Sequence, residues 1–189
     1  MVFDRQQHQE AVGENIQQAG RDLYSLTIQL PDKRRDSAIE KVVSGLYDIT
    51  GNQELSFTPP DTQTYTVHDK ILHNKLETYR QFYDQFTDVY PLVQHKINIA
   101  STSDLSFRIK VIRYVQGVHR KTVMALQPAT LNGQGAPDWI IEKMSCEIQQ
   151  DLQNCGASIT LEELQAVDYV IFYVFAECKI FDKPPIKQR

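Results

Sequence analysis

Hydrophobic residues recur every three or four positions through most of the chain after residue 60, which is the spacing of helices that bury one face. The run from Leu164 to Phe181 is apolar around nearly its whole circumference, so we expect this helix at the centre of the fold and expect Pro184-Pro185 to end it. The pattern predicts four helices, over about 66–98, 104–125, 138–154 and 160–181.

Residues with known roles at helix ends mark the boundaries of these helices. Thr160 and Glu163 have the spacing of a capping box, and Asp138 is expected to cap the N-terminus of the helix that follows it. Gly156 is suited to the left-handed conformation that closes a helix. Pro91 lacks an amide proton, so we expect a kink or break between it and the residue before it.

The first third of the chain differs in its pattern. Residues Tyr24–Leu30 alternate apolar and polar with a period of two, which predicts a half-buried strand. A short helix is expected over 36–47 and a second short strand over 54–58. The fold class expected is therefore mainly α, with four or five helices and a short N-terminal β arm. Its parts are a strand-bearing arm (1–30), a connector with a short helix (31–59) and a helical domain (60–189).

Composition narrows the class of protein without naming its function. The 189 residues are 41% hydrophobic and carry a net charge of −4, which excludes a collagen-like or wholly disordered chain and gives no global attraction to nucleic acid. The three cysteines are odd in number and form no CxxC pair, so we expect no disulfide framework, no structural zinc and a cytoplasmic location. The apolar run 169–176 is too short to span a membrane. We expect no cofactor, no metal and no membrane partner.

Positive charge is concentrated in the helix expected over 104–125. Lys110, Arg113 and Gly117, followed by Arg120 or Lys121, are three to four residues apart and share one face. Such a face can bind an acidic protein partner or phosphates, although nucleic acid is not favoured by the overall charge. The alternative interpretation is an ordinary solvated helix face.

Arg113 and His119 suggest one catalytic alternative. Their spacing is similar to the Arg-x(4–6)-His motif of the HEPN ribonucleases, which are small helical toxins that need no metal. The resemblance implies that His119 would act as an acid or base and that Arg113 would stabilise the phosphorane charge. An Arg and a His at this spacing also arise easily by chance, because the motif is short.

Three stretches resemble segments of bacterial conflict-system proteins. Residues 14–24 (ENIQQAGRDLY) are similar to the GxxNxQxAGRD β-segments near the N-termini of many such proteins. Residues 60–79 (PDTQTYTVHDKILHNKLETY) and 172–184 (FYVFAECKIFDKP) resemble the opening and the ending of the helical C-terminal domains of ABC-three-component systems. The resemblance implies a helical recruitment or coupling domain with no catalytic residue, joined to antiviral defence.

The leading hypothesis is therefore a non-enzymatic adaptor or effector-associated domain of a prokaryotic antiviral conflict system. Its protein partner would be encoded nearby, as an ATPase or an effector, and the exposed edge of the β arm would allow a homo-oligomer. The candidate partner-binding residues are Asn15, Gln17, Gly20, Arg21, Asp22, Tyr24, Leu26, Ile28, Lys110, Arg113 and Arg120. The alternatives are the HEPN-like nuclease and a small immunity or antitoxin protein.

Overall fold

The fold is known from a computed structural model, which describes residues 32–51, 66–126, 136–156, 159–177 and 179–185. The described residues form helices and contain no strand, so the expectation of a mainly helical protein is confirmed. The β arm and the strand expected over 54–58 lie outside the described residues. The helices are α2 (Asp32–Thr50), α3 (Val67–His73), α4 (Glu77–Gln81), α5 (Tyr83–Ala100), α6 (Phe107–Ala125), α8 (Ala136–Asn154) and α9 (Leu161–Ala176).

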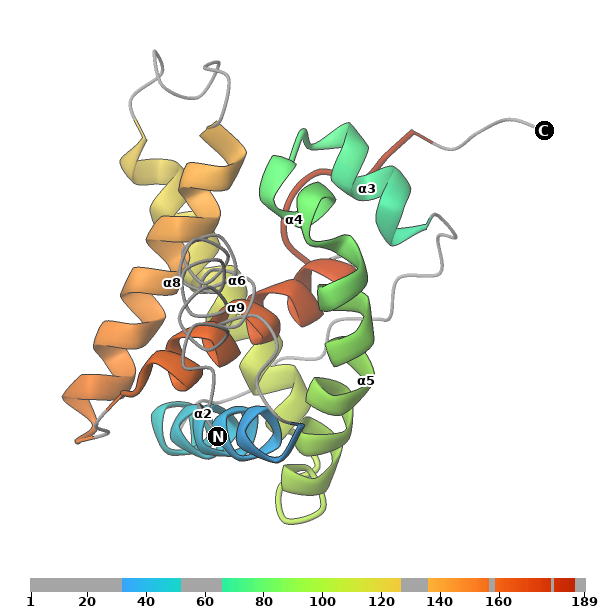
Figure 1. Cartoon of the computed structure of the whole chain (residues 1–189). Coiled ribbons are helices and arrows are strands. Elements are labelled where there is room, and N and C mark those ends of the chain that lie inside the picture. Colours follow the sequence, from blue (N-terminus) through green and yellow to red (C-terminus); the bar gives the residue numbers. More distant parts are fainter. Residues whose placement is uncertain (1–31, 52–65, 127–135, 157–158, 178, 186–189) are drawn as a thin grey trace, which may run out of the picture. The chain divides into compact units, whose positions relative to one another are not determined.

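The chain divides into two units, residues 1–35 and 36–189, and of the first only the first turn of α2 is described. Within the second unit α9 is the central helix, as its all-round apolar sequence predicts. It packs between α5 and α8 (Figure 1), and every residue from Tyr169 to Phe175 is buried. The α2 helix also belongs to this core, because Ile39 and Leu46 are fully buried against it. It is longer than the helix expected over 36–47.

The start of α9 follows the sequence prediction and its end does not. The Thr160 hydroxyl accepts a hydrogen bond from the Glu163 amide, and the Glu163 carboxylate accepts one from the Thr160 amide, so the capping box is confirmed. The helix ends at Ala176, however, and not at Pro184-Pro185. The reason is tertiary, since the chain must leave the helix to bury Ile180 and to meet α3.

The buried Lys70 of α3 and the partly exposed Asn74, its C-cap, hold the segment that follows α9. The Nζ atom of Lys70 donates to the carbonyl oxygens of Phe175 (2.8 Å) and Ile180 (2.6 Å). The side chain of Asn74 donates to the Asp182 carbonyl and accepts from the Asp182 amide. We call these contacts the Lys70–Asn74 latch. They join the two stretches, 60–79 and 172–184, that resemble one family of helical domains.

The pattern over 66–98 resolves into three helices in place of one. The first break follows α3, where Lys75 adopts a left-handed φ of 55° directly after the latch residue Asn74. The expected break at Pro91 is wrong, because Pro91 lies inside α5. Pro91 is exposed, so water can bind the Thr87 carbonyl that loses its intrahelical donor.

Asp138 does not cap its own helix, contrary to the sequence prediction. It lies in the first turn of α8, and its carboxylate accepts hydrogen bonds from the backbone amides of Glu77 (3.1 Å) and Thr78 (2.9 Å). Asp138 therefore satisfies the first amides of α4, a helix that has no side-chain cap of its own. Gly156 has the expected left-handed φ, at 86°.

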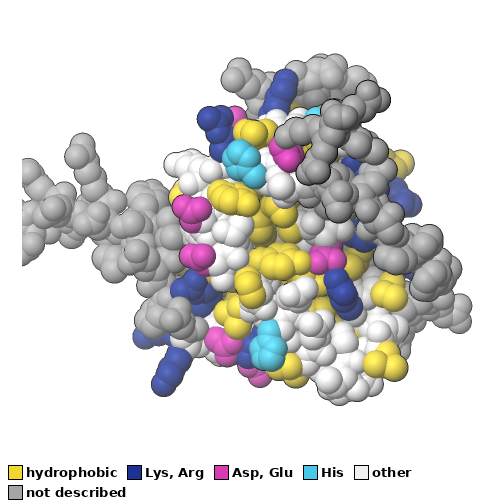
Figure 2. Space-filling view, turned by 90° about the vertical axis from the view of Figure 1, so that its right-hand side faces the viewer, with side chains coloured by type: hydrophobic (Ala, Val, Ile, Leu, Met, Phe, Trp, Pro, Cys, Tyr) yellow, Lys and Arg dark blue, Asp and Glu magenta, His cyan; other side chains and the backbone are white. Residues whose placement is uncertain are grey.

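The side of the molecule that carries α3 and α5 mixes apolar and charged side chains. Figure 2 shows hydrophobic side chains gathered in a band across the middle of this side, between residues of both charge signs. On these two helices, Leu72 of α3 and Ile99 of α5 are exposed large hydrophobic residues. This mixture contrasts with α6, on which every charged residue is basic.

Candidate functional site

The candidate basic face lies on α6, which packs mainly against α8 and more lightly against α5 and α9. Its apolar residues Val111, Val115 and Val118 face this core and are buried. The opposite side of the helix is therefore the side on which the candidate residues Arg113 and Arg120 can meet a partner.

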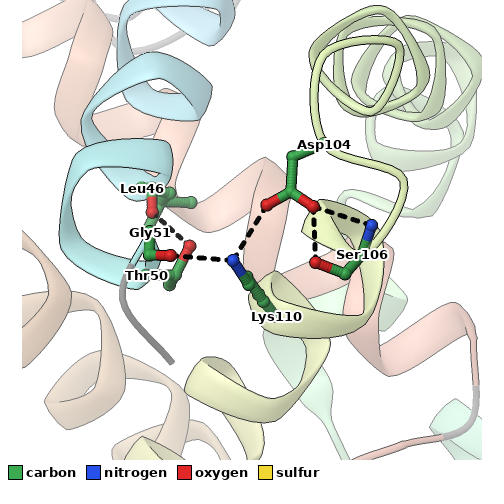
Figure 3. A network of polar contacts seen from close by, with 6 residues as sticks. All are labelled: Leu46, Thr50, Gly51, Asp104, Ser106 and Lys110. Carbon is green, nitrogen blue, oxygen red and sulfur yellow. Dashed lines mark hydrogen bonds and ion pairs between the residues drawn. The ribbon is translucent and has the colours of Figure 1, made fainter. Parts of the chain in front are cut away.

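Lys110 is withdrawn from this face, although its spacing groups it with Arg113 and Arg120. Only 8% of the residue is exposed, and its Nζ atom donates to the Gly51 carbonyl (2.8 Å) and to the Asp104 carboxylate (2.9 Å). Figure 3 shows this network, in which Ser106 also hydrogen bonds Asp104. The hydrogen bonds from Ser106 and Lys110 lower the pKa of Asp104 to about 2. Lys110 thus ties the end of α2 to the turn before α6.

Arg113, Gly117 and Arg120 of the expected face lie on one line along α6, together with Ile109 and Met124. Ile109, Arg113, Gly117, Arg120 and Met124 succeed one another at intervals of four, four, three and four residues, so they lie on one side of the helix. We call this line the α6 stripe. Of its side chains, Met124 is 78% exposed, Ile109 is 36% exposed and Arg120 is exposed, whereas Arg113 is half-buried.

Gly117 leaves an opening in the middle of the α6 stripe. A Cβ atom placed on this glycine would meet nothing within 4 Å, so the helix backbone there is open to close approach. The α6 sequence contains no Asp or Glu, and Lys121, beside the stripe, pairs with Glu147 of α8 at 2.6 Å. The stripe therefore has an apolar residue at each end, Gly117 near its middle and one arginine on either side of that glycine.

Arg108 forms a second network where α6 meets α5 and α9. Its guanidinium donates to the Tyr173 hydroxyl (2.8 Å) and to the Glu177 carboxylate (2.6 Å), and Glu177 also accepts from the Tyr90 hydroxyl (2.6 Å). Burial and then the Glu177 hydrogen bond raise the pKa of Tyr90 well above its ordinary value. Glu177 thus neutralises Arg108, a second cation of α6. The sequence did not predict this network, because its members come from three helices.

His119 does not share a surface with Arg113. The imidazole lies 4.8 Å from the Phe181 ring, centre to centre, and its Nε2 atom is buried without a hydrogen-bond partner among the described residues. Burial, and then the charge of Lys70, lower the pKa of His119. Six residues along a helix correspond to about 240° of rotation, so Arg113 on the stripe and His119 in the interior point in different directions. This geometry does not favour a shared ribonuclease centre.

The remaining sequence candidates cannot be compared with the structure. Asn15, Gln17, Gly20, Arg21, Asp22, Tyr24, Leu26 and Ile28 all lie outside the described residues. Cys178 lies outside them as well, whereas Cys146 and Cys155 are exposed and form no disulfide. Within the described ranges, no group of three or more His, Cys, Asp or Glu residues could hold a metal ion. No described helix is long and apolar enough to cross a membrane.

Comparison of the chain with protein-family models, with curated proteins and with solved structures found no match.

Proposed function

We propose that this chain is a non-enzymatic interaction module of a prokaryotic antiviral conflict system, which couples partner proteins through the α6 stripe. The observation that carries the proposal is the stripe itself, where Ile109 and Met124 remain exposed around an open glycine. Exposed apolar residues beside basic ones are typical of surfaces that bind other proteins. The odd number of cysteines suits a cytoplasmic protein.

The partner that fits the α6 stripe best is an acidic amphipathic helix. A helix can pack closely over Gly117 because no side chain stands there, and its apolar residues would cover Ile109 and Met124. Its carboxylates would face the exposed Arg120. A basic face on a chain of net charge −4 also selects acidic partners locally while the rest of the molecule repels them.

The link to conflict systems comes from the sequence resemblance. The Lys70–Asn74 latch supports the interpretation that the resembling stretches serve the fold of the helical domain. The latch joins the opening stretch to the ending stretch through two buried hydrogen bonds from Lys70 and an exposed one from Asn74. The residue types shared with that family thus have a structural role here. Recruitment of partners would then be left to the surface, where the α6 stripe lies.

The proposal is tested by affinity purification of the tagged chain from its native host, with the bound proteins quantified by mass spectrometry. Gly117→Trp is the test variant, because its side chain enters open space and should leave the fold intact. Gln150→Trp, at an exposed position of α8, is the matched control. We expect the partner to be lost from Gly117→Trp and retained by Gln150→Trp. Equal recovery of the same partner with both variants would refute docking on the stripe.

A further inference from the structure

A cavity of about 540 Å³ lies between α4, α5, α8 and α9, on a part of the molecule that the α6 stripe does not use. Its volume is within the range of pockets that bind small molecules. Phe86 and Ile141 give it apolar walls, and Trp139, which is 38% exposed, also lines it. A site of this kind needs a few polar groups that select the ligand, and the cavity has them.

The charged groups that line the cavity are all carboxylates. Asp138, Glu142 and Asp168 line it, and no lysine or arginine is among its described lining residues. Lys143 is the cation on the adjoining turn of α8, with its Nζ atom 5.4 Å from the centre of the Trp139 ring. The cavity therefore combines carboxylates with aromatic rings, the two groups that attract organic cations.

Tyr79 marks the inner end of this cavity with an unused polar atom. The residue is 1% exposed, and its hydroxyl is buried without a hydrogen-bond partner among the described residues. A buried hydroxyl of this kind costs free energy unless something binds it. Burial, followed by the charges of Asp168 and Asp138, raises the pKa of Tyr79 well above its ordinary value, so the group stays a neutral hydroxyl beside negative charge.

Asp168 is the second unusual group of the cavity. It comes from the central helix α9 and accepts a hydrogen bond from the buried Ser145. Burial raises its pKa to about 6, and the hydrogen bond from Ser145 opposes that shift only in part. Near neutral pH the cavity thus holds a poorly hydrated carboxylate, which a cationic ligand would stabilise.

We propose that this cavity binds a small organic cation, an amine or a guanidine, with Asp168 as its counter-charge and the Tyr79 hydroxyl as an inner hydrogen-bond acceptor. The aromatic rings would cover the hydrocarbon part of the ligand, and Trp139 would contact its charged end or its stem. This site goes beyond the proposed interaction function, because it gives the module a ligand as well as a partner.

The chain offers a direct readout, since Trp139 is its only tryptophan and lines the cavity. The experiment titrates the full-length protein with agmatine, which carries both an amine and a guanidine, and follows tryptophan fluorescence and calorimetric heat near neutral pH. The neutral control ligand is 1,6-hexanediol, which has similar length and no charge. We expect a saturable signal with agmatine and none with hexanediol.

The variants separate binding from folding. Asp168→Asn should weaken agmatine binding about tenfold or more, and Tyr79→Phe about threefold to tenfold, with unchanged far-UV circular dichroism. Asp88→Asn is the matched control, because Asp88 is an exposed acid of α5 that does not line the cavity, and its affinity should equal that of the wild type.

Three results would overturn the proposal. One is the absence of saturable binding by either method up to about 10 mM agmatine. Another is an equal affinity of the wild type and Asp168→Asn. The third is binding of a short arginine-containing peptide but not of agmatine, which would assign the cavity to a partner's side chain.

Discussion

The Lys70–Asn74 latch leads to a quantitative prediction, which Lys70→Met tests. Lys70 is fully buried, and its Nζ atom donates to two carbonyl oxygens and lies 4.3 Å from the centre of the Phe175 ring. Methionine retains most of the hydrocarbon stem but removes the charge and both hydrogen bonds. The variant therefore isolates the polar part of the latch.

The expected loss of stability is about 3 kcal/mol. Each hydrogen bond to a charged group contributes about 1.5–3 kcal/mol, and carbonyl oxygens that lose an interior donor cost about 1–3 kcal/mol. The desolvation of the buried ammonium group, which methionine avoids, offsets part of this sum. With a urea slope of about 2 kcal/mol per molar, the unfolding midpoint should fall by about 1.5 M.

The assay is urea unfolding followed by circular dichroism, with Lys121→Met as the matched control. Lys121 is exposed and pairs with Glu147, so the same substitution there should cost less than about 1 kcal/mol. Lys70→Met should also raise the pKa of His119, since the charge of Lys70 contributes to lowering it. Equal midpoints for the two variants, or an unchanged His119 pKa by NMR titration, would refute the reasoning.

Four further predictions follow. Asp168→Asn should stabilise the protein near pH 7 by up to about 3 kcal/mol. Burial raises the pKa of the wild-type carboxyl from 3.8 to about 6, so the wild-type protein loses stability as the pH rises through that window. Urea midpoints measured at acid and at neutral pH should show a gain for the variant at neutral pH only. His119→Gln should flatten the stability loss expected as pH falls below 6.5, since burial lowers the pKa of His119 and the unfolded state takes up the proton first; melting temperatures on either side of that pH would reveal it. Gly117→Ala should raise stability by about 0.5–1 kcal/mol, because alanine favours the helix and meets no neighbour there; a lower melting temperature would contradict the open surface. Deletion of residues 1–30 should leave the helical circular dichroism in place but lower the oligomeric mass in light scattering, and an unchanged mass would exclude assembly through the arm.

Local signals in the sequence identified most helices of this fold. The capping box at Thr160 and Glu163 marks the start of α9 because its hydrogen bonds join residues three apart. The helix expected over 104–125 is present as α6, which begins at Phe107, because its apolar residues recur with the helical period. These features depend on neighbours along the chain, which a sequence displays directly.

The features that the sequence did not reveal depend on distant residues. Asp138 has the residue type of an N-cap, but it caps α4, whose amides lie about sixty positions earlier. Lys110 has the period of a surface cation, but Gly51 and Asp104 hold it in the interior. The cavity at Asp168 likewise forms only where four helices meet, so no spacing along the chain predicts it.

The most direct test of the central claim, that partners dock on the α6 stripe, is photo-crosslinking in the native host. A photoreactive amino acid would replace Met124 on the stripe in one variant and Gln150 on α8 in the other, both at exposed positions. Our account predicts a crosslink from position 124 to an acidic helical segment of another protein, and none from position 150. A partner captured equally from both positions, or only from position 150, would contradict it.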